Sequence, residues 1–280
     1  MKKRPSIGVA LSGGMGYTQA HIGVLRTLVE AGVSIDYVAG TSGGAIIGAF
    51  YAAGLSFDDM VAAASRMRWR NLTRFDFSLM GLFSSLEIQR QIENIIGSCR
   101  FEELMVPFAA VATELLSGTK YVFRTGSVPF AVRASCNIAH IYTPIRYNDM
   151  LLIDGAYTEK LPVETVRGMG AEVVIGVDVT YRSQRIEQPR NMIQINAMLL
   201  SLLAEQNARL SRQRADVMVY PSMRSHSAVE LGRLEENIRA GEQAANEALD
   251  KIDSIVHHYS RFILKKRWNS LKKAFKEAFS

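Results

Sequence analysis

The chain has 280 residues, a formal net charge of +6, 48% hydrophobic residues and 21% charged residues. This composition excludes a disordered chain, and the two cysteines, Cys99 and Cys136, exclude a disulfide framework or a cysteine-based metal site. Residues 261–280 hold seven basic residues and one acidic residue, whereas the rest of the chain holds 26 of each sign. The basic character belongs to the tail, so we expect no nucleic-acid-binding core.

The first 54 residues predict two strand–helix units. Ile7–Leu11 is an apolar run typical of a buried parallel strand, too short for the core of a signal peptide. Residues 18–31 have apolar residues at helical spacing, and Asp36–Gly40 is a second short strand. Small residues then continue through residues 43–54. This order predicts a right-handed parallel α/β unit.

The remainder continues the alternation of strands and helices. Residues 56–105 are expected to be mostly helical, with a break at about 71–85. The apolar stretch 75–86 suggests a core-packed irregular segment, a cap over an acyl channel or a second interfacial contact. Further strands are predicted at 106–114, 120–123, 141–147, 151–153, 172–178 and 215–220, and helices at 128–136, 162–168, 190–213 and 233–256. We expect an α/β fold, with a central, mostly parallel sheet flanked by helices, in one domain over residues 6–258.

Ser42 stands at the predicted turn between the second strand and the following helix. The motif G-x-S-x-G is formed by Gly40, Ser42 and Gly44, and Gly43 also follows the serine. In a nucleophile elbow the serine occupies a strained strand-to-helix turn, and glycines allow the close backbone contacts. The helix N-terminus favours a developing oxyanion. The motif alone is weak, but its context predicts a nucleophilic serine.

A glycine-rich loop follows the first predicted strand. It contains Gly13, Gly14, Met15 and Gly16. Because the carboxyl ends of neighbouring parallel strands share one edge of a sheet, we expect this loop beside Ser42. Its backbone N–H groups are candidates for an oxyanion hole. A tight turn without a ligand and a phosphate-binding turn remain alternatives, although the loop lacks the lysine of a P-loop and does not fit the dinucleotide fingerprint.

An acidic residue, Asp154, follows the apolar stretch Leu151–Ile153 and precedes Gly155. A carboxylate at this strand end is placed to accept the proton of Ser42 or to orient the serine. An ordinary turn aspartate is the alternative.

Together, in this order, the three motifs resemble the patatin-like phospholipase family. Further segments are similar to its bacterial branch: Ala20–Leu25, Ala131–Ser135, Leu161–Val163 and Gly170–Asp178. The resemblance covers about residues 7–180 and continues weakly to about 250. It implies a serine lipid-acyl hydrolase of the phospholipase A, lysophospholipase or carboxylesterase type. It also implies a Ser42–Asp154 dyad, an oxyanion hole at Gly13–Gly16, lipid ester substrates, and no metal or other cofactor.

The glycine-rich loop departs from the family motif G-G-G-x-R-G. Met15 stands at the third glycine, Tyr17 at the arginine and Thr18 at the last glycine. Ala139-His140 similarly stands where relatives often have proline-glycine. Reduced activity or a shifted substrate is therefore expected, and the alternative function is a membrane-associated interaction protein on an inactive scaffold.

The histidines do not favour a Ser–acid–His triad. After Asp154 the chain has only His226, in a polar stretch, and His257 and His258, at the start of the tail. None of the three lies at a predicted strand end. His21 and His140 precede the acid, contrary to the order of an α/β-hydrolase triad.

The C-terminal tail has the pattern of a basic amphipathic helix over residues 259–280. Apolar residues recur at intervals of 4, 3, 4 and 3, at Leu264, Trp268, Leu271, Phe275 and Ala278. Such helices bind anionic lipid surfaces, whereas packing on the domain and a dimer contact are the alternatives. No stretch is apolar enough to span a membrane. We expect a cytoplasmic protein, attached peripherally to the inner face of the membrane, with a homo-oligomer left open.

Overall fold

The computed structural model describes residues 4–67, 74–78, 81–139, 141–181, 188, 192–223 and 233–278. An eight-stranded sheet with strand order β10-β9-β1-β2-β5-β8-β7 forms the centre, and β6 pairs with β5. The strands are β1 (Ile7–Leu11), β2 (Tyr37–Thr41), β5 (Phe108–Glu114), β6 (Thr119–Phe123), β7 (Ile145–Tyr147), β8 (Met150–Asp154), β9 (Val173–Val177) and β10 (Val217–Val219). The five strands from β10 to β5 are parallel, whereas β6, β7 and β8 pair antiparallel.

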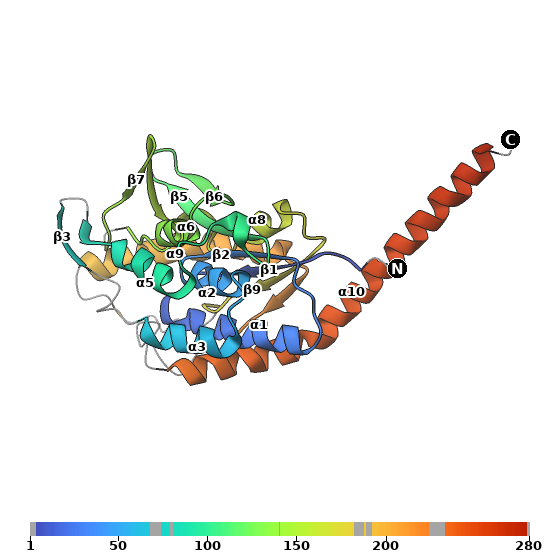
Figure 1. Cartoon of the computed structure of the whole chain (residues 1–280), viewed down its shortest axis with the longest axis horizontal. Coiled ribbons are helices and arrows are strands. Elements are labelled where there is room, and N and C mark those ends of the chain that lie inside the picture. The colour runs from blue at the N-terminus through green and yellow to red at the C-terminus, as the bar shows by residue number, and fades with distance from the viewer. Residues whose placement is uncertain are drawn as a thin grey trace.

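Helices cover both faces of the sheet (Figure 1). The helices are α1 (Ala20–Glu30), α2 (Gly43–Ala52), α3 (Phe57–Arg66), α5 (Leu86–Ile96), α6 (Val128–Ser135), α7 (Ala156–Glu159), α8 (Val163–Gly168), α9 (Met192–Arg214) and α10 (Leu234–Ala278), with short 3₁₀ helices η1 (Met15–Gln19) and η2 (Phe101–Glu103). The mostly parallel α/β fold expected from the sequence is confirmed.

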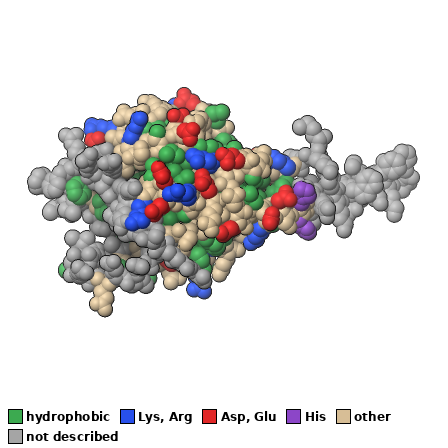
Figure 2. Space-filling model, turned by 90° about the horizontal axis from the view of Figure 1, so that it is seen from below, with side chains coloured by type: hydrophobic (Ala, Val, Ile, Leu, Met, Phe, Trp, Pro, Cys, Tyr) green, Lys and Arg blue, Asp and Glu red, His purple; other side chains and the backbone are tan. Residues whose placement is uncertain are grey.

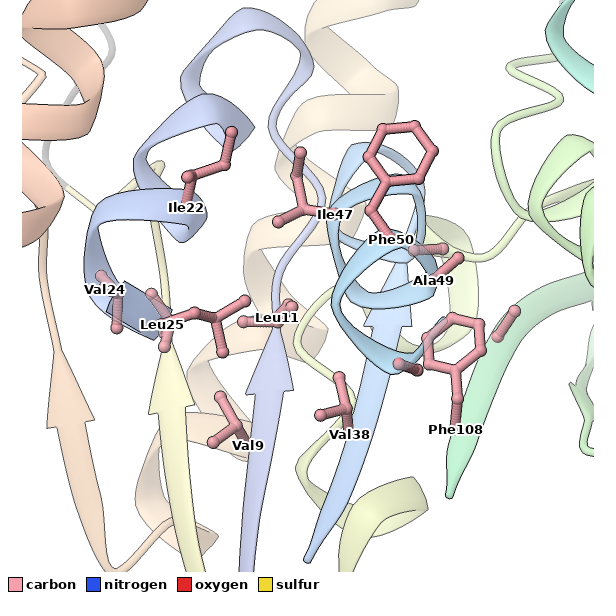
Figure 3. Close-up of a cluster of buried hydrophobic side chains, with 14 of the residues drawn as sticks. Val9, Leu11, Ile22, Val24, Leu25, Val38, Ile47, Ala49, Phe50 and Phe108 are labelled. Carbon is pink, nitrogen blue, oxygen red and sulfur yellow. The ribbon is translucent and has the colours of Figure 1, made fainter. Parts of the chain in front are cut away.

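The side chains of β1 point alternately to the two faces of the sheet and so contribute to two separate clusters of the core. Val9 and Leu11 pack with α1 and α2 in the larger cluster (Figure 3). Ala10 packs on the opposite face, with α8. Successive strand residues point to opposite faces, so an apolar run buries both sides of the sheet. The sheet therefore has a full helical layer on each face, which leaves the strand ends as the place for a site.

The stretch 75–86 differs from its expected irregular form. Strands β3 (Arg74–Ser78) and β4 (Gly81–Ser84) form an antiparallel hairpin, with Phe75 opposite Phe83. Aromatic residues at cross-strand positions favour such pairing. β7 is also shorter than the predicted strand 141–147, because Pro144 has no N–H to join the ladder.

The last helix is continuous across the expected boundary at residue 259. α10 runs from Leu234 to Ala278, and no glycine or proline follows Gly241. Its first turns pack closely on α1, where a Cβ at Gly241 would lie 2.0 Å from the Ala20 carbonyl oxygen. The later part leaves the body of the protein (Figure 1). The side chains that would make the tail amphipathic lie outside the described residues, so that pattern stays a prediction.

The face beneath the sheet, with α10 and α1, mixes acidic and basic side chains (Figure 2). This agrees with the balanced charge of residues 1–260. Within the described ranges, no helix is long and apolar enough to cross a membrane.

Candidate active site

Ser42 lies at the turn between β2 and α2, as the motif predicts. Its backbone has φ 53° and ψ −129°, a conformation that is costly for a residue with a side chain. Its N–H donates to Ser135 Oγ at 2.8 Å. The side chain is largely buried, with 9% exposure. A serine held in this strained turn at a helix N-terminus has the geometry of a nucleophile elbow.

Close backbone contacts explain the glycines around Ser42. A Cβ at Gly40 would lie 2.4 Å from the Gly44 carbonyl oxygen, and one at Gly44 would lie 2.3 Å from the Leu11 carbonyl oxygen. At Gly43 a Cβ would lie 2.5 Å from Thr18 Oγ1, and at Gly155 it would lie 2.1 Å from the Val111 carbonyl oxygen. These distances are far inside van der Waals contact. Gly40, Gly44 and Gly155 therefore let two backbone segments meet at the site, and Gly43 makes room for the side chain of Thr18.

Replacing Gly44 with alanine is expected to lower the free energy of unfolding by more than about 3 kcal/mol, because the new methyl group meets the backbone of β1 rather than a movable side chain. Urea unfolding followed by circular dichroism measures the change. Gly168→Ala is the matched control, because its nearest neighbour is Arg124 Nη2 at 3.6 Å. Equal stability of the two variants would contradict the close contact at Gly44.

The glycine-rich loop lies beside Ser42, where the parallel strands predicted it. A Cβ at Gly13 would be 3.2 Å from Ser42 Cβ. However, the Gly13 N–H donates to the Lys160 carbonyl oxygen at 3.0 Å, so in this conformation it is not available to an oxyanion. Among the described residues, no hydrogen bond uses the N–H of Gly14, Met15 or Gly16. These three groups remain as candidate donors.

The two unusual residues of the loop have structural roles. Tyr17 is buried in the larger core cluster, so it places no charge near Ser42. Thr18 is also buried, and its Oγ1 donates to the Met15 carbonyl oxygen at 2.6 Å. Met15 has φ 50°, a left-handed conformation that favours glycine. The Thr18 hydrogen bond helps hold Met15 in it, so the loop keeps its turn without the motif's third glycine.

Asp154 is the last residue of β8, which runs antiparallel to β5. It lies opposite Ala112, one residue after Val111, the partner of Thr41, so the register places Asp154 next to Ser42. Burial raises the pKa of its carboxyl group to about 6, although hydrogen bonds with Ser42 and with the N–H of Ala156 lower it in part. Oδ1 accepts the Ala156 N–H at 2.8 Å. The structure thus brings together two residues that are 112 positions apart in the chain. A buried carboxylate with a raised pKa is a stronger base than an ordinary aspartate.

Two further residues lie at this site that the sequence analysis did not predict to be there. Ser135 holds the N–H of Ser42, and Cys136 interacts with both Ser42 and Asp154. Burial, followed by the charge of Asp154, raises the pKa of the Cys136 thiol well above its ordinary value. The thiol is therefore protonated near neutral pH and is a poor nucleophile. No local pattern indicates these contacts, because both residues reach the site through the packing of α6.

An apolar cavity opens beside Ser42. Side chains from η1, α2, α3, α5 and the segment after α6 line it, together with Ser42 and Gly43: Met15, Ile46, Ile47, Met67, Ile88, Ile138 and Tyr142. The hairpin β3–β4 is tied to the cavity wall, since the Phe83 N–H donates to the Ile141 carbonyl oxygen at 3.0 Å. An aliphatic chain fits these walls chemically.

Of the histidines that the structure describes, none lines this cavity. His21 is fully buried, and its Nε2 lies 2.9 Å from the Ser12 carbonyl oxygen, behind the loop. Burial lowers the pKa of His21 to about 4, so its ring is neutral. His257 lies exposed on α10, 3.3 Å from Asp253. His140 and His226 lie outside the described residues.

Comparison with known proteins shows the family of the chain. The model of the patatin-like phospholipase family matches residues 9–167, so the chain belongs to this family. The match includes the glycine-rich loop, Ser42 and Asp154.

Three relatives illustrate the range of the family. An uncharacterised NTE family protein of Mycobacterium bovis is 33% identical over 178 residues, covering 62% of this chain and 49% of that protein. Lysophospholipase NTE1 of Meyerozyma guilliermondii is 31% identical over 62% of this chain and 12% of that protein. Patatin-like phospholipase domain-containing protein 7 of Mus musculus is 31% identical over 64% of this chain and 14% of that protein. The chain thus matches about half, or much less, of each relative.

Two solved structures share the fold. VipD from Legionella pneumophila has a TM-score of 0.53 and 13% identity, covering 90% of this chain and 67% of VipD. The type III effector protein ExoU has a TM-score of 0.52 and 15% identity, covering 90% of this chain and 54% of ExoU.

Proposed function

We propose that the protein is a serine lipid-acyl hydrolase in which Ser42 is the nucleophile and Asp154 the base. The observation that carries this proposal is the position of Ser42, in its strained turn at the apolar cavity, next to the buried Asp154 carboxyl group, whose pKa it lowers against the effect of burial. Membership of the family and the relative named lysophospholipase support a lipid ester as substrate.

The reaction proceeds by covalent acyl transfer. Asp154 accepts the proton as Ser42 Oγ bonds to the ester carbonyl carbon. The oxyanion receives hydrogen bonds from the N–H groups of Gly14 and Met15, each worth roughly 3 kcal/mol of transition-state stabilisation. The leaving alcohol takes the proton from Asp154, and an acyl-enzyme remains. Water, deprotonated by Asp154, then attacks the acyl carbon. The bond between Ser42 Oγ and the acyl carbon breaks as Asp154 returns the proton to Oγ, which releases the fatty acid and restores Ser42 and the ionised Asp154.

The alternative, an inactive scaffold with an interaction role, rested on Tyr17 and Thr18. Both side chains are buried, and Thr18 braces the loop beside Ser42. They therefore replace the motif residues structurally, which favours the hydrolase.

The pH dependence of kcat/KM tests the base. Only ionised Asp154 accepts a proton, and its pKa is raised to about 6. We expect kcat/KM for a soluble p-nitrophenyl ester to be half-maximal near pH 6 and to fall about tenfold per pH unit well below it. Circular dichroism at each pH separates this loss from acid unfolding. A flat profile down to pH 4.5 in folded protein would contradict Asp154 as the base.

We also propose that residues 261–280 bind anionic membrane surfaces. The support is their excess of basic residues and the apolar spacing of the sequence. The projection of α10 from the body leaves the helical part of this segment, residues 261–278, clear of the domain (Figure 1).

A further inference from the structure

Helix α9 carries a stripe of exposed aliphatic side chains. Its members and their exposed fractions are Met192 77%, Ile195 46%, Leu199 53%, Leu202 60%, Leu203 59% and Leu210 59%. A helix turns by about 100° per residue, so these six positions lie within an arc of roughly 100°. The opposite face, with Ala204, Ala208 and Ser211, is buried. The stripe is thus a second apolar face, which the body of the protein does not use.

Five of the six members of the stripe, from Met192 to Leu203, lie toward the catalytic edge of the sheet. α9 leads directly into β10, which is parallel to β9 and β1, so α9 runs antiparallel to the strands and its N-terminus points toward their carboxyl ends. Asn207 fixes the level of the helix: its Nδ2 donates to the Ala156 carbonyl oxygen at 2.8 Å, just after Asp154. Met192 lies fifteen residues before Asn207, about 22 Å along the helix. The N-terminal half of α9 therefore reaches past the carboxyl ends of the strands.

The basic tail lies far from this edge. Asn237, near the start of α10, donates to the Gly16 carbonyl oxygen at 3.1 Å, so α10 begins beside the glycine-rich loop. From Asn237 to Arg261 the helix covers about 36 Å. The tail leaves the body at the end opposite β3 (Figure 1). Binding of the tail to a membrane would not by itself bring Ser42 to the lipid.

We propose that the exposed stripe of α9 inserts into the surface of a lipid bilayer and places the catalytic edge against it. This inference rests on the proposed lipid-acyl hydrolysis. Leucine, isoleucine and methionine partition into hydrocarbon, and a single helix face is sufficient for interfacial insertion. Six side chains on one helix fall short of the roughly 20–30 residues that each partner gives to a stable protein interface. A bilayer therefore fits this surface better than a second copy of the chain.

The test compares two substitutions of exposed apolar residues at opposite edges of the sheet. Leu199→Gln/Leu202→Gln changes the stripe, whereas Met105→Gln changes a residue that is 77% exposed just before β5, at the other edge. Co-sedimentation with phosphatidylcholine vesicles, and with vesicles that also contain anionic lipid, measures binding, and fatty-acid release from the phosphatidylcholine vesicles measures turnover. Hydrolysis of soluble p-nitrophenyl butyrate reports the catalytic centre alone. A third protein lacking residues 261–280 isolates the tail.

The stripe variant is expected to lose at least about tenfold in vesicle binding and vesicle turnover, in low and high salt alike, with butyrate hydrolysis unchanged. Met105→Gln should match wild type in all assays. The truncated protein should lose only the salt-sensitive binding to anionic vesicles. Unchanged vesicle binding by the stripe variant would overturn the inference, as would a wild-type dimer in light scattering that the variant lacks. If the wild-type protein does not hydrolyse p-nitrophenyl butyrate, the proposed function is contradicted, whereas co-sedimentation with vesicles still tests the role of the stripe.

Discussion

Replacing Ser42 with alanine is expected to lower kcat/KM for ester hydrolysis by at least about 10³-fold. The substitution removes the atom that bonds to the acyl carbon, and catalysis from the oxyanion donors and the cavity alone cannot form an acyl-enzyme. Release of p-nitrophenol from a soluble ester measures the loss without any contribution from vesicle binding.

Ser6→Ala is the matched control for this prediction. Ser6 Oγ donates to the Gly170 carbonyl oxygen at 2.9 Å, at the amino end of β1 and so at the opposite edge of the sheet. Its loss is expected to cost about 1 kcal/mol of stability and to leave kcat/KM unchanged. Retention of wild-type activity by Ser42→Ala would show that another residue is the nucleophile.

Replacing Asp154 with asparagine is expected to change activity and stability in opposite directions. Activity should fall by at least about 10³-fold, because the amide cannot accept the proton of Ser42. Stability should rise at pH 7.5, because burial makes the ionised carboxylate costly in the folded state. Asparagine keeps an oxygen that can accept the Ala156 N–H, so the local turn is retained.

The pH dependence of this stabilisation follows from linkage. The folded carboxyl group has a pKa of about 6 and the unfolded one has the ordinary value of 3.8. Between these values the folded state binds more protons, so the free energy of unfolding of wild type falls as the pH rises through this window. The advantage of Asp154→Asn should be largest above pH 6, at about 3 kcal/mol, and vanish toward pH 4. Urea unfolding of both proteins at pH 4 and pH 7.5 measures it; an equal advantage at both values would contradict the buried ionised carboxylate.

The parts of the fold that were predictable from sequence depend on local patterns. Apolar runs such as Ile7–Leu11 and Val173–Val177 indicate buried strands, and their order with the helices indicates a parallel sheet. The same reasoning places the loop after β1 beside Ser42. The hairpin β3–β4 was not predicted, because its pairing depends on contacts with residues 141–143 as well as on its own composition.

The candidate site was predictable in its main groups but not in its hydrogen bonds. Ser42 follows a strand of the parallel part of the sheet, so its place at the carboxyl ends of those strands follows from topology. Asp154 ends β8, which runs antiparallel to β5, and it reaches Ser42 through the register that sets it opposite Ala112. By contrast, the N–H of Gly13 is taken by Lys160, whose carbonyl group reaches the loop only through the packing of α7. The supporting contacts of Ser135 and Thr18 also depend on tertiary structure. A glycine in a motif therefore indicates space for backbone, whereas its hydrogen-bond partner must come from the folded structure.

Labelling with a fluorophosphonate, followed by mass spectrometry of the digested protein, tests the central proposal most directly. The reagent forms a stable covalent adduct only with an activated serine. We predict that wild type gains one adduct on the peptide containing Ser42, that Ser42→Ala gains none, and that Asp154→Asn reacts far more slowly. An adduct on any other serine, or no adduct on folded wild type, would contradict Ser42 as the nucleophile.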